Sequence, residues 1–272
     1  MGTSSLVPAE LLKPVVAVAR AAGDAIMAIY RSGDFDTQLK DDDSPLTRAD
    51  LAAHRTIVDA LAALTPGVPA LSEESVTIPY DVRSAWTTYW LIDPLDGTKE
   101  FIQRNGEFTV NIALIRDGRP ILGVVHAPAI GTTYGAAQGA GAFRSDARAE
   151  DVPIHVLGYA GGTVKVVASR SHASPELGAF LDSIGDYECA SMGSSLKLCL
   201  IAEGAAHLYP RLAPTCEWDI AAGHCVVNEA GGAVWDVTGA VVRYNKPDVL
   251  NPYFVATGSP EYPWREHLRP AG

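Results

Sequence analysis

Two carboxylates separated by two residues mark the segment of this chain that is richest in potential chemistry. Asp93 and Asp96 stand in D-P-L-D-G-T (93–98), directly after the apolar run Tyr89–Ile92, which predicts a buried strand. Two acids and the carbonyl of Leu95 would then form an all-oxygen set at the strand's end, which suits magnesium rather than a soft metal. A helical turn beginning after this pair would direct unpaired amides at a phosphate. The alternative is a polar Asp-Gly turn after a core strand.

Further acids are candidates to join this pair, and each has a purely structural alternative. Glu73 and Glu74 follow a short apolar run and could form a solvated loop pair. Asp219, in E-W-D-I-A-A-G, could be a dipole-favoured acid in the first turn of a helix. Asp50, in S-P-L-T-R-A-D, lies three residues after Thr47, which is close to a capping box. The residues alone leave both interpretations open.

The elements that would position these acids follow from hydrophobic periodicity. Helical spacing predicts helices over 11–30, ended by Gly33, and over 47–64, ended by T-P-G. Strand-like runs at 109–115, 121–127 and 132–137 predict an antiparallel meander after the strand at 89–92. Strand and helix patterns then alternate over 164–168, 175–184, 194–204, 206–209 and 218–230.

The charged segment 145–153 is the expected boundary between two subdomains. Residues 1–150 would form an α+β unit with the antiparallel sheet and most of the acids. Residues 151–272 would form an α/β unit with Asp219 and the residues that bind substrate.

Composition restricts the class of protein. A chain of 272 residues that is 47% hydrophobic can bury a large core. With 32 acids against 21 lysines and arginines, its net charge of −11 disfavours a nucleic-acid binding face. A polyanionic substrate would need local cations, for which Lys197, Arg170 and Arg211 are the candidates.

Neither a membrane-spanning apolar run nor a signal peptide is visible. We therefore expect a cytoplasmic protein, with peripheral attachment at the inner membrane as the alternative. The four cysteines are widely spaced without a C-x-x-C pair, which favours buried free thiols over a zinc site.

Two segments in the second half could contact a ligand. S-R-S-H (169–172) follows a predicted strand, so Arg170 and His172 could project from its end, although a lone histidine there is more commonly a surface residue. G-S-S-L-K (193–197) is typical of a helix start that offers amides, hydroxyls and an ammonium to a phosphate. A simple serine cap is the alternative.

Taken in order, these segments resemble the inositol monophosphatase-like, metal-dependent phosphatases, and within them the bacterial CysQ-type 3'(2'),5'-bisphosphate nucleotidases. The resemblance spans about Leu12 to Phe254. Its general markers are S-P-L-T-R-A-D, L-S-E-E, D-P-L-D-G-T and W-D-I-A-A-G. The narrower markers of the nucleotidase branch are K-E-F (99–101), R-N-G-E-F-T-V-N-I-A-L-I (104–115), S-R-S-H and G-S-S-L-K. The implied fold is α+β, a layered α/β/α/β/α sandwich of the inositol monophosphatase and fructose-1,6-bisphosphatase type.

The resemblance also implies a metal centre. Glu73, Asp93 and the Leu95 carbonyl would hold one Mg²⁺, while Asp93, Asp96 and Asp219 would hold a second. A third, weaker ion would lie near Glu73 and Asp50. Carboxylates forced together stay ionised only when cations compensate them, which is consistent with such a set.

For the reaction, the resemblance implies in-line attack of water on phosphorus. Thr98 with Asp50 or Glu73 would orient the water and accept its proton, and the amides of Gly97 and Thr98 would hold the nonbridging oxygens. The second phosphate of the substrate would meet Ser194, Lys197 and Arg211, with Arg170 nearby. The adenosine would lie near His172 and Tyr209. Asp219 would also face the substrate.

The implied activity is hydrolysis of adenosine 3',5'-bisphosphate to AMP and phosphate, with 3'-phosphoadenylyl sulfate as a second substrate, in sulfate assimilation and with sensitivity to lithium. The alternatives are an inositol mono- or bisphosphate or fructose 1,6-bisphosphate phosphatase of the same fold, and a non-catalytic interaction scaffold. The assembly would be a monomer or a homodimer. The acidic loop 41–43 could close over the site as a lid.

Overall fold

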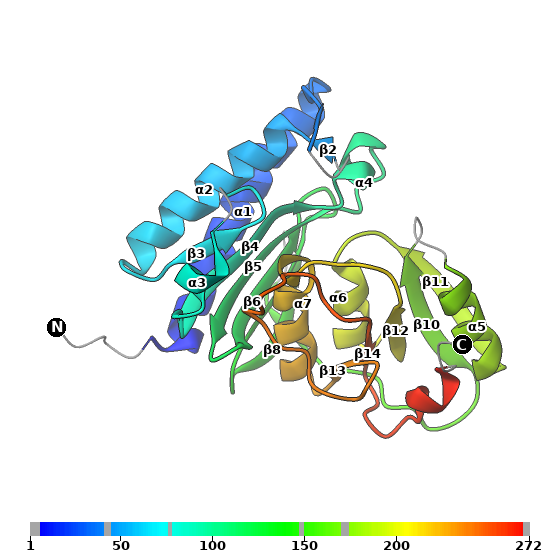
Figure 1. The fold of residues 1–272 in the computed structure, drawn as a ribbon. Coiled ribbons are helices and arrows are strands. Elements are labelled where there is room, and N and C mark those ends of the chain that lie inside the picture. The colour runs from blue at the N-terminus through cyan, green and yellow to red at the C-terminus, as the bar shows by residue number, and fades with distance from the viewer. Residues whose placement is uncertain (1–5, 41–44, 76–77, 147–149, 170–173, 269–272) are drawn as a thin grey trace.

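A computed structural model describes residues 6–40, 45–75, 78–146, 150–169 and 174–268. Its secondary structure forms five layers, in which two sheets alternate with three layers of helices (Figure 1). The predicted α+β sandwich is therefore confirmed.

The first layer consists of two long helices, α1 (Pro8–Ser32) and α2 (Arg48–Leu64), which pack on each other and cover one face of the larger sheet (Figure 1). The stripe of Val15, Ala19, Ala22 and Ile26 is fully buried, which is why this part of the chain is helical. Gly33 ends α1 in the left-handed conformation, with φ of 75°. Both predicted helices are confirmed, although α1 begins three residues before its expected start.

The larger sheet has seven strands in the order β3-β4-β5-β6-β7-β8-β9. These are β3 (Ala70–Ser72), β4 (Thr88–Asp96), β5 (Thr109–Arg116), β6 (Arg119–Ala127), β7 (Thr132–Ala137), β8 (Gly141–Asp146) and β9 (Val152–Ile154). All neighbours pair antiparallel except β3 and β4, which run parallel. The predicted meander is confirmed. The division near residue 150 stays a prediction, and β9 of this sheet lies beyond it.

Two helices, α6 (Leu196–Ala202) and α7 (Glu217–Glu229), form the middle layer between the sheets (Figure 1). A Cβ on Gly123 of β6 would overlap the carbonyl oxygen of Ala222, so a glycine is needed where α7 lies directly on the sheet. A Cβ on Gly223 would come within 2.6 Å of the Leu198 side chain, which places α6 equally close to α7.

The second sheet has the order β11-β10-β12-β14-β13. Its strands are β10 (Val164–Ser169), β11 (Tyr187–Met192), β12 (Leu208–Arg211), β13 (Ala233–Asp236) and β14 (Phe254–Thr257), and its outer face carries α5 (Pro175–Ile184) and a 3-10 turn (Trp264–His267). The edge strand β11 has no counterpart among the predicted elements. Short elements complete the chain: a hairpin of β1 (Gln38–Leu39) and β2 (Pro45–Leu46), α3 (Tyr80–Arg83) and α4 (Thr98–Ile102).

The prediction that the cysteines are buried free thiols is confirmed only in part. Cys199 and Cys225 are buried free thiols as predicted, but Cys189 is exposed on the edge strand β11, so the prediction of burial is wrong there.

Across the described ranges, no helix has both the length and the apolarity needed to cross a bilayer.

Candidate active site

The acid pair of D-P-L-D-G-T lies at the end of β4, where a bulge sets its direction. Asp93 pairs with Asn111 and Asp96 with Thr109, so three steps along β4 oppose two steps along β5. In a regular strand, residues three apart face opposite sides of the sheet, and one inserted residue corrects this. Both aspartates therefore face the same side as Asn111 and Thr109. Pro94, which has no N–H to donate, lies within the irregular stretch.

Glu73 reaches the same end of the sheet from β3. Ser72 pairs with Ile92, and the Glu73 amide donates to the Ile92 carbonyl at 3.1 Å, so the turn after β3 starts beside Asp93. The side chains of Glu73 and Glu74 are not a solvated pair. Lys40 Nζ lies 2.7 Å from Glu73 Oε1 and 2.6 Å from Glu74 Oε1.

Asp50 serves as a helix cap and also reaches the site. Its Oδ2 accepts from the Thr47 amide at 2.7 Å and from Thr47 Oγ1 at 2.6 Å, which completes a capping box at the start of α2. Its Oδ1 lies 3.4 Å from Thr98 Oγ1, and that hydroxyl is also 3.3 Å from the carbonyl oxygen of Leu95. Because a hydroxyl carries one proton, Thr98 donates to one of these acceptors at a time.

Asp219 repeats this arrangement at the start of α7. Its Oδ2 accepts from the Cys216 amide at 2.8 Å, the first-turn role given as the alternative, while the carboxylate lines the central cavity. The preceding Glu217 is fully buried and accepts from the amides of Asn245 and Lys246 at 2.8 and 3.0 Å. These bonds fix the start of α7 and with it the position of Asp219.

Burial and mutual repulsion make these carboxyl groups unusually basic. Burial, with the charges of Glu73, Asp96 and Asp219, raises the pKa of Asp93 well above its usual range. Burial also raises the pKa of Asp219, and raises that of Asp96 to about 6 although the Lys197 ammonium opposes the change. The charges of Glu73 and Asp96 contribute to the raised pKa of both Asp93 and Asp219, so these carboxylates share one electrostatic environment, and bound cations would relieve their repulsion.

The donor set consists of hard oxygen atoms and fits Mg²⁺ in its chemistry. Among the described residues, however, no three His, Cys, Asp or Glu side chains are arranged to hold a metal ion as they stand. Existing contacts give a reason, because Lys40 engages Glu73, and the amides of Leu95, Ser195 and Cys216 donate to Asp93, Asp96 and Asp219 respectively. Glu73, Asp96 and Asp219 therefore line one cavity, with Asp93 buried next to it, without being preset in a ligating geometry.

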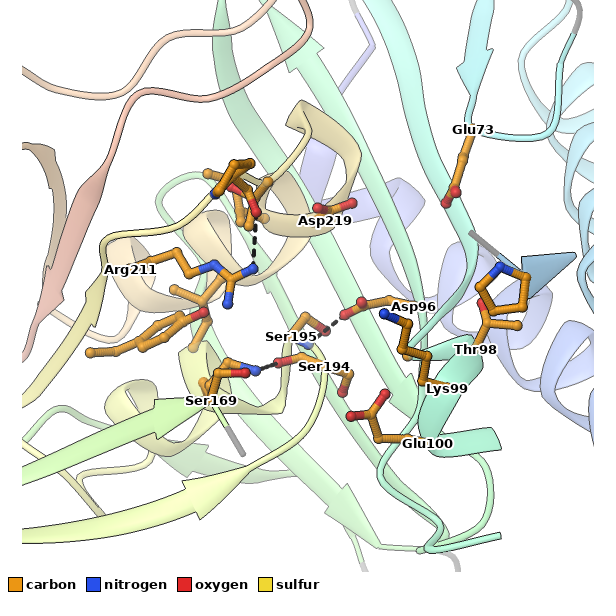
Figure 2. Close-up of a pocket in the computed structure, with 18 residues that line it drawn as sticks. Glu73, Asp96, Thr98, Lys99, Glu100, Ser169, Ser194, Ser195, Arg211 and Asp219 are labelled. Atoms are coloured by element: carbon orange, nitrogen blue, oxygen red, sulfur yellow. Dashed lines mark hydrogen bonds between the residues drawn. The ribbon is translucent and has the colours of Figure 1, made fainter. Parts of the chain in front are cut away.

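The cavity has a volume of about 580 Å³ and opens between the two sheets and the start of α7. Figure 2 shows Glu73, Asp96 and Asp219 around one end of it, with Thr98 beside them, and Arg211 and Ser169 at the opposite end. Lys99 and Glu100, from the K-E-F marker, also line the cavity. The cavity thus combines acids at one end with a guanidinium at the other.

A tight turn at 192–195 forms the cavity wall next to Asp96. The Ser195 amide donates to Asp96 Oδ2 at 2.5 Å, and the Gly193 amide donates to Glu107 Oε2 at 2.7 Å. Ser194 has a left-handed backbone with φ of 47°, which is strained for a residue with a side chain. As predicted, a helix, α6, starts directly after this turn.

Lys197 lines the cavity but points its ammonium at the turn. Its Nζ lies 2.5 Å from the Ser194 carbonyl oxygen and 3.2 Å from that of Met192. Its side chain is buried, and burial lowers its pKa to about 8. Lys197 therefore holds the strained turn in place, a role that its sequence position did not indicate.

Tyr209 and Arg211 enter the cavity from β12. Arg211 donates through Nη2 to the Pro214 carbonyl at 2.9 Å, and its buried Nε has no hydrogen-bond partner among the described residues. The Tyr209 ring lies 5.5 Å from Lys197 Nζ. The predicted residues Arg170 and His172, and the loop 41–43, lie outside the described residues.

Several side chains that hold the acids were not singled out from the sequence. Ser195 Oγ lies 2.8 Å from Thr109 Oγ1 and donates to Asn111 Oδ1 at 2.7 Å, which links β5 to the turn. The alternation of Thr109 and Asn111 in T-V-N would have placed both on one face of a strand. For Lys40, the sequence contains no comparable signal.

Comparison with known proteins places this arrangement in a class. The model of the inositol monophosphatase family matches residues 8–268. The structure of an IMPase from Thermotoga maritima superposes with a TM-score of 0.74 at 26% identity, covering 90% of each chain. The chain belongs to the inositol monophosphatase family. Dependence on magnesium and sensitivity to lithium are typical of this family.

More similar relatives carry a narrower name. The 3'(2'),5'-bisphosphate nucleotidase CysQ of Escherichia coli K12 is 50% identical over 246 residues, which are 90% of this chain and 98% of that protein. The namesake from Aggregatibacter actinomycetemcomitans is 38% identical over 94% of this chain and 95% of its own length. The crystal structure of CysQ from Bacteroides thetaiotaomicron matches with a TM-score of 0.79 at 42% identity, over 90% of this chain and 96% of that one.

Proposed function

We propose that this protein is a magnesium-dependent 3'(2'),5'-bisphosphate nucleotidase that converts adenosine 3',5'-bisphosphate and water into AMP and phosphate. The observation that carries the proposal is its 50% identity to a nucleotidase of which it covers 98%. We add 3'-phosphoadenylyl sulfate as a second substrate, which links the activity to sulfate assimilation. A cavity of about 580 Å³ is within the range of small-molecule sites.

The acids that meet near the end of β4, from β4 itself, the turn after β3 and the start of α7, are the proposed metal ligands. Glu73, Asp93 and the Leu95 carbonyl would bind one Mg²⁺, and Asp93, Asp96 and Asp219 a second, with Asp93 shared. A third ion near Glu73 and Asp50 would bind more weakly. When bound, Mg²⁺ would supply the positive charge that activates a water molecule and stabilises the leaving oxygen. The raised pKa values of Asp93, Asp96 and Asp219 support this role, because a site that repels its own charges gains most from cations.

Thr98 and Asp50 are the proposed pair that positions the attacking water and accepts its proton, with Glu73 as the alternative acceptor. The 3.4 Å separation between Thr98 Oγ1 and Asp50 Oδ1 supports the pairing. Burial raises the pKa of Asp50, which makes it a better proton acceptor than an exposed aspartate. The amides of Gly97 and Thr98 would hold the nonbridging phosphoryl oxygens, and Gly97 adopts the left-handed conformation, with φ of 89°, that begins this turn.

The opposite end of the cavity is the proposed site of the second phosphate. Arg211 is the strongest candidate, because its guanidinium is buried and its Nε lacks a hydrogen-bond partner within the described ranges. Ser194 would contribute its hydroxyl. Lys197 would add charge from behind the turn, since its protons already point to two carbonyl oxygens. Tyr209 would contact the adenosine, and Arg170 and His172 keep their proposed roles near the substrate.

The main alternative is a phosphatase of the same family acting on inositol mono- or bisphosphates or on fructose 1,6-bisphosphate. The K-E-F marker favours the nucleotide, because Lys99 and Glu100 line the cavity itself. A non-catalytic scaffold is disfavoured, since such a protein has no need to keep several mutually repelling acids in one place. A cytoplasmic location, with peripheral attachment at the inner membrane as the alternative, and a monomeric or homodimeric state stay predictions.

A phosphate-release assay tests the proposal. Adenosine 3',5'-bisphosphate, inositol 1-phosphate and fructose 1,6-bisphosphate are compared at equal concentration with magnesium. We expect the nucleotide to give the highest kcat/KM, and a preference for either sugar phosphate would refute the proposed substrate. Asp93→Asn should abolish turnover of every substrate, and an exposed control, Asp182→Asn on α5, should leave it unchanged.

The same panel separates the two ends of the cavity. Arg211→Lys removes the planar guanidinium and keeps the charge. It should raise KM for the bisphosphate and have little effect on 3'-AMP, which lacks the second phosphate. An equal loss on both substrates would remove Arg211 from the second-phosphate site.

A further inference from the structure

Lys40 binds the two glutamates that follow β3, and the two do not have equal surroundings. Its Nζ lies 2.7 Å from Glu73 Oε1 and 2.6 Å from Glu74 Oε1. The Glu74 side chain is 6% exposed and that of Glu73 is 26% exposed. Glu74 is thus the buried partner, and Glu73 is the partner that lines the cavity.

The position of Lys40 connects this ion pair to the cavity wall. It directly follows β1, which is paired with β2, and Pro45 of β2 lines the cavity together with Glu73. Both residues of β1 are exposed and both residues of β2 are only half-buried, so neither strand has a fully buried side chain. The bonds from Lys40 to the glutamates therefore fasten the hairpin against the turn after β3.

Charge balance gives this contact a second role. Glu73, Asp96 and Asp219 line the acid end of the cavity, and Asp50 and Asp93 are buried next to it. Lys40 provides positive charge on the Glu73 side, and Lys197 does so on the Asp96 side. A divalent cation bound to Glu73 would share this carboxylate with an ammonium group that is already in contact with it. Two cations on one carboxylate repel strongly at such separations.

We propose that Lys40 is a built-in substitute cation for the metal-free protein. It neutralises Glu73 while the site holds no magnesium, and it gives up Glu73, though not Glu74, when a metal ion binds. The free energy of the Lys40–Glu73 contact is thus subtracted from metal binding, and the hairpin is loosened from Glu73 in the same step. This inference rests on the proposed function in one respect, that Glu73 is a magnesium ligand.

Calorimetric titration of the metal-free protein with MgCl₂ tests the proposal. Lys40→Met removes the ammonium and keeps most of the apolar stem. We expect it to bind Mg²⁺ about three- to tenfold more tightly, since a partly exposed ion pair contributes on the order of 1 kcal/mol. Lys40→Arg keeps the charge and should stay close to the wild type. Lys13→Met removes an exposed lysine on α1 and controls for the change in net charge.

Thermal melting in EDTA provides a second measurement that requires no metal and no substrate. Lys40→Met should melt at a lower temperature than the wild type in EDTA, because Glu73 and Glu74 then repel each other without a counter-ion. The difference in melting temperature between Lys40→Met and the wild type should become smaller at saturating Mg²⁺. Unchanged or weaker Mg²⁺ binding by Lys40→Met, or an unchanged melting temperature in EDTA, would overturn the proposal.

The test of Lys40 and the test of the proposed function can fail independently of each other. Hydrolysis of adenosine 3',5'-bisphosphate is measured on the same preparations. If the wild type hydrolyses the nucleotide but Lys40→Met binds Mg²⁺ no more tightly, only the role of Lys40 is wrong. If Mg²⁺ binding tightens as expected but no bisphosphate is hydrolysed, the proposed substrate is wrong and the role of Lys40 stands.

Discussion

Replacing Asp96 by Asn should stabilise the metal-free protein at neutral pH. The pKa of Asp96 is raised from 3.8 to about 6, chiefly by burial, so the folded state binds this proton more tightly than the unfolded state. Ionised Asp96 therefore destabilises the folded state. This destabilisation is absent below pH 3.8, grows as pH rises, and is complete above pH 6. At about 1.4 kcal/mol per pH unit, it reaches about 3 kcal/mol at pH 7. This is an upper limit, because Asp96 is partly exposed to the cavity.

Asparagine keeps the shape of the side chain and an oxygen that can accept from the Ser195 amide, but it carries no charge. In EDTA at pH 7, Asp96→Asn should raise the melting temperature by about 5–10 °C, given a typical 2–4 °C per kcal/mol for a chain near this size. The gain should nearly vanish at pH 4, where the wild-type carboxyl group is protonated when folded. The exposed Asp182→Asn should show neither effect.

With magnesium, the wild type should melt at a higher temperature than Asp96→Asn. A ligand that binds only the folded state stabilises it, and the variant lacks a proposed metal ligand. The reasoning is refuted if Asp96→Asn melts at or below the wild type in EDTA at pH 7. A gain of equal size at pH 4 would also refute it, because the stabilisation would then have a cause other than charge.

Three further predictions concern the metal, the turn and acid stability. Chelation should abolish phosphate release and MgCl₂ should restore it; full activity in EDTA would contradict the proposed chemistry. Gly193→Ala would place a Cβ 2.8 Å from the Glu107 carbonyl oxygen and 2.9 Å from Glu100 Cγ. This overpacking, of about 1–3 kcal/mol, should lower the melting temperature and raise KM about tenfold. Unchanged kinetics would exclude a role for this turn in binding. Burial lowers the pKa of His126 from 6.5 to about 4, so the unfolded state takes up the proton first and stability should fall by about 3 kcal/mol between pH 6.5 and 4. In urea titrations at pH 7 and 4.5, His126→Gln should reduce this loss, and an unchanged loss would assign it to other groups.

The elements that follow a strong hydrophobic period were predictable from the sequence. The stripes of α1 and α2 and the strands of the meander are buried as their periods indicate, because burial of those side chains is what stabilises the elements. The edge strand β11 was not predictable in this way. Four of its six residues are exposed, so Y-E-C-A-S-M lacks the apolar alternation that identifies a strand.

In the candidate site, too, some features were predictable from the sequence and others depend on contacts between distant segments. The spacing of D-P-L-D placed two acids at the end of a strand, but the bulge that turns both to one side depends on pairing with β5, which a single segment does not contain. The contact of Lys40 with Glu73 joins residues 33 positions apart. Lys197 was predicted to meet a phosphate, and that role stays a prediction; its contacts with the carbonyl oxygens of Met192 and Ser194 depend on the fold of the turn, which the sequence does not specify.

Asp50 and Asp219 show why a structural and a functional interpretation of one residue need not compete. Each carboxylate uses Oδ2 to accept from a backbone amide at the start of a helix, at 2.7 Å for Asp50 and 2.8 Å for Asp219. A carboxylate has two oxygens, so the cap leaves Oδ1 available and also limits rotation of the group about its terminal bond. The bond that stabilises the helix therefore also orients the carboxylate, which lines the cavity in Asp219 and brings Oδ1 to 3.4 Å from Thr98 Oγ1 in Asp50. A capping signal in the sequence is, for this reason, no argument against a role in binding or catalysis when the helix begins at the edge of a site.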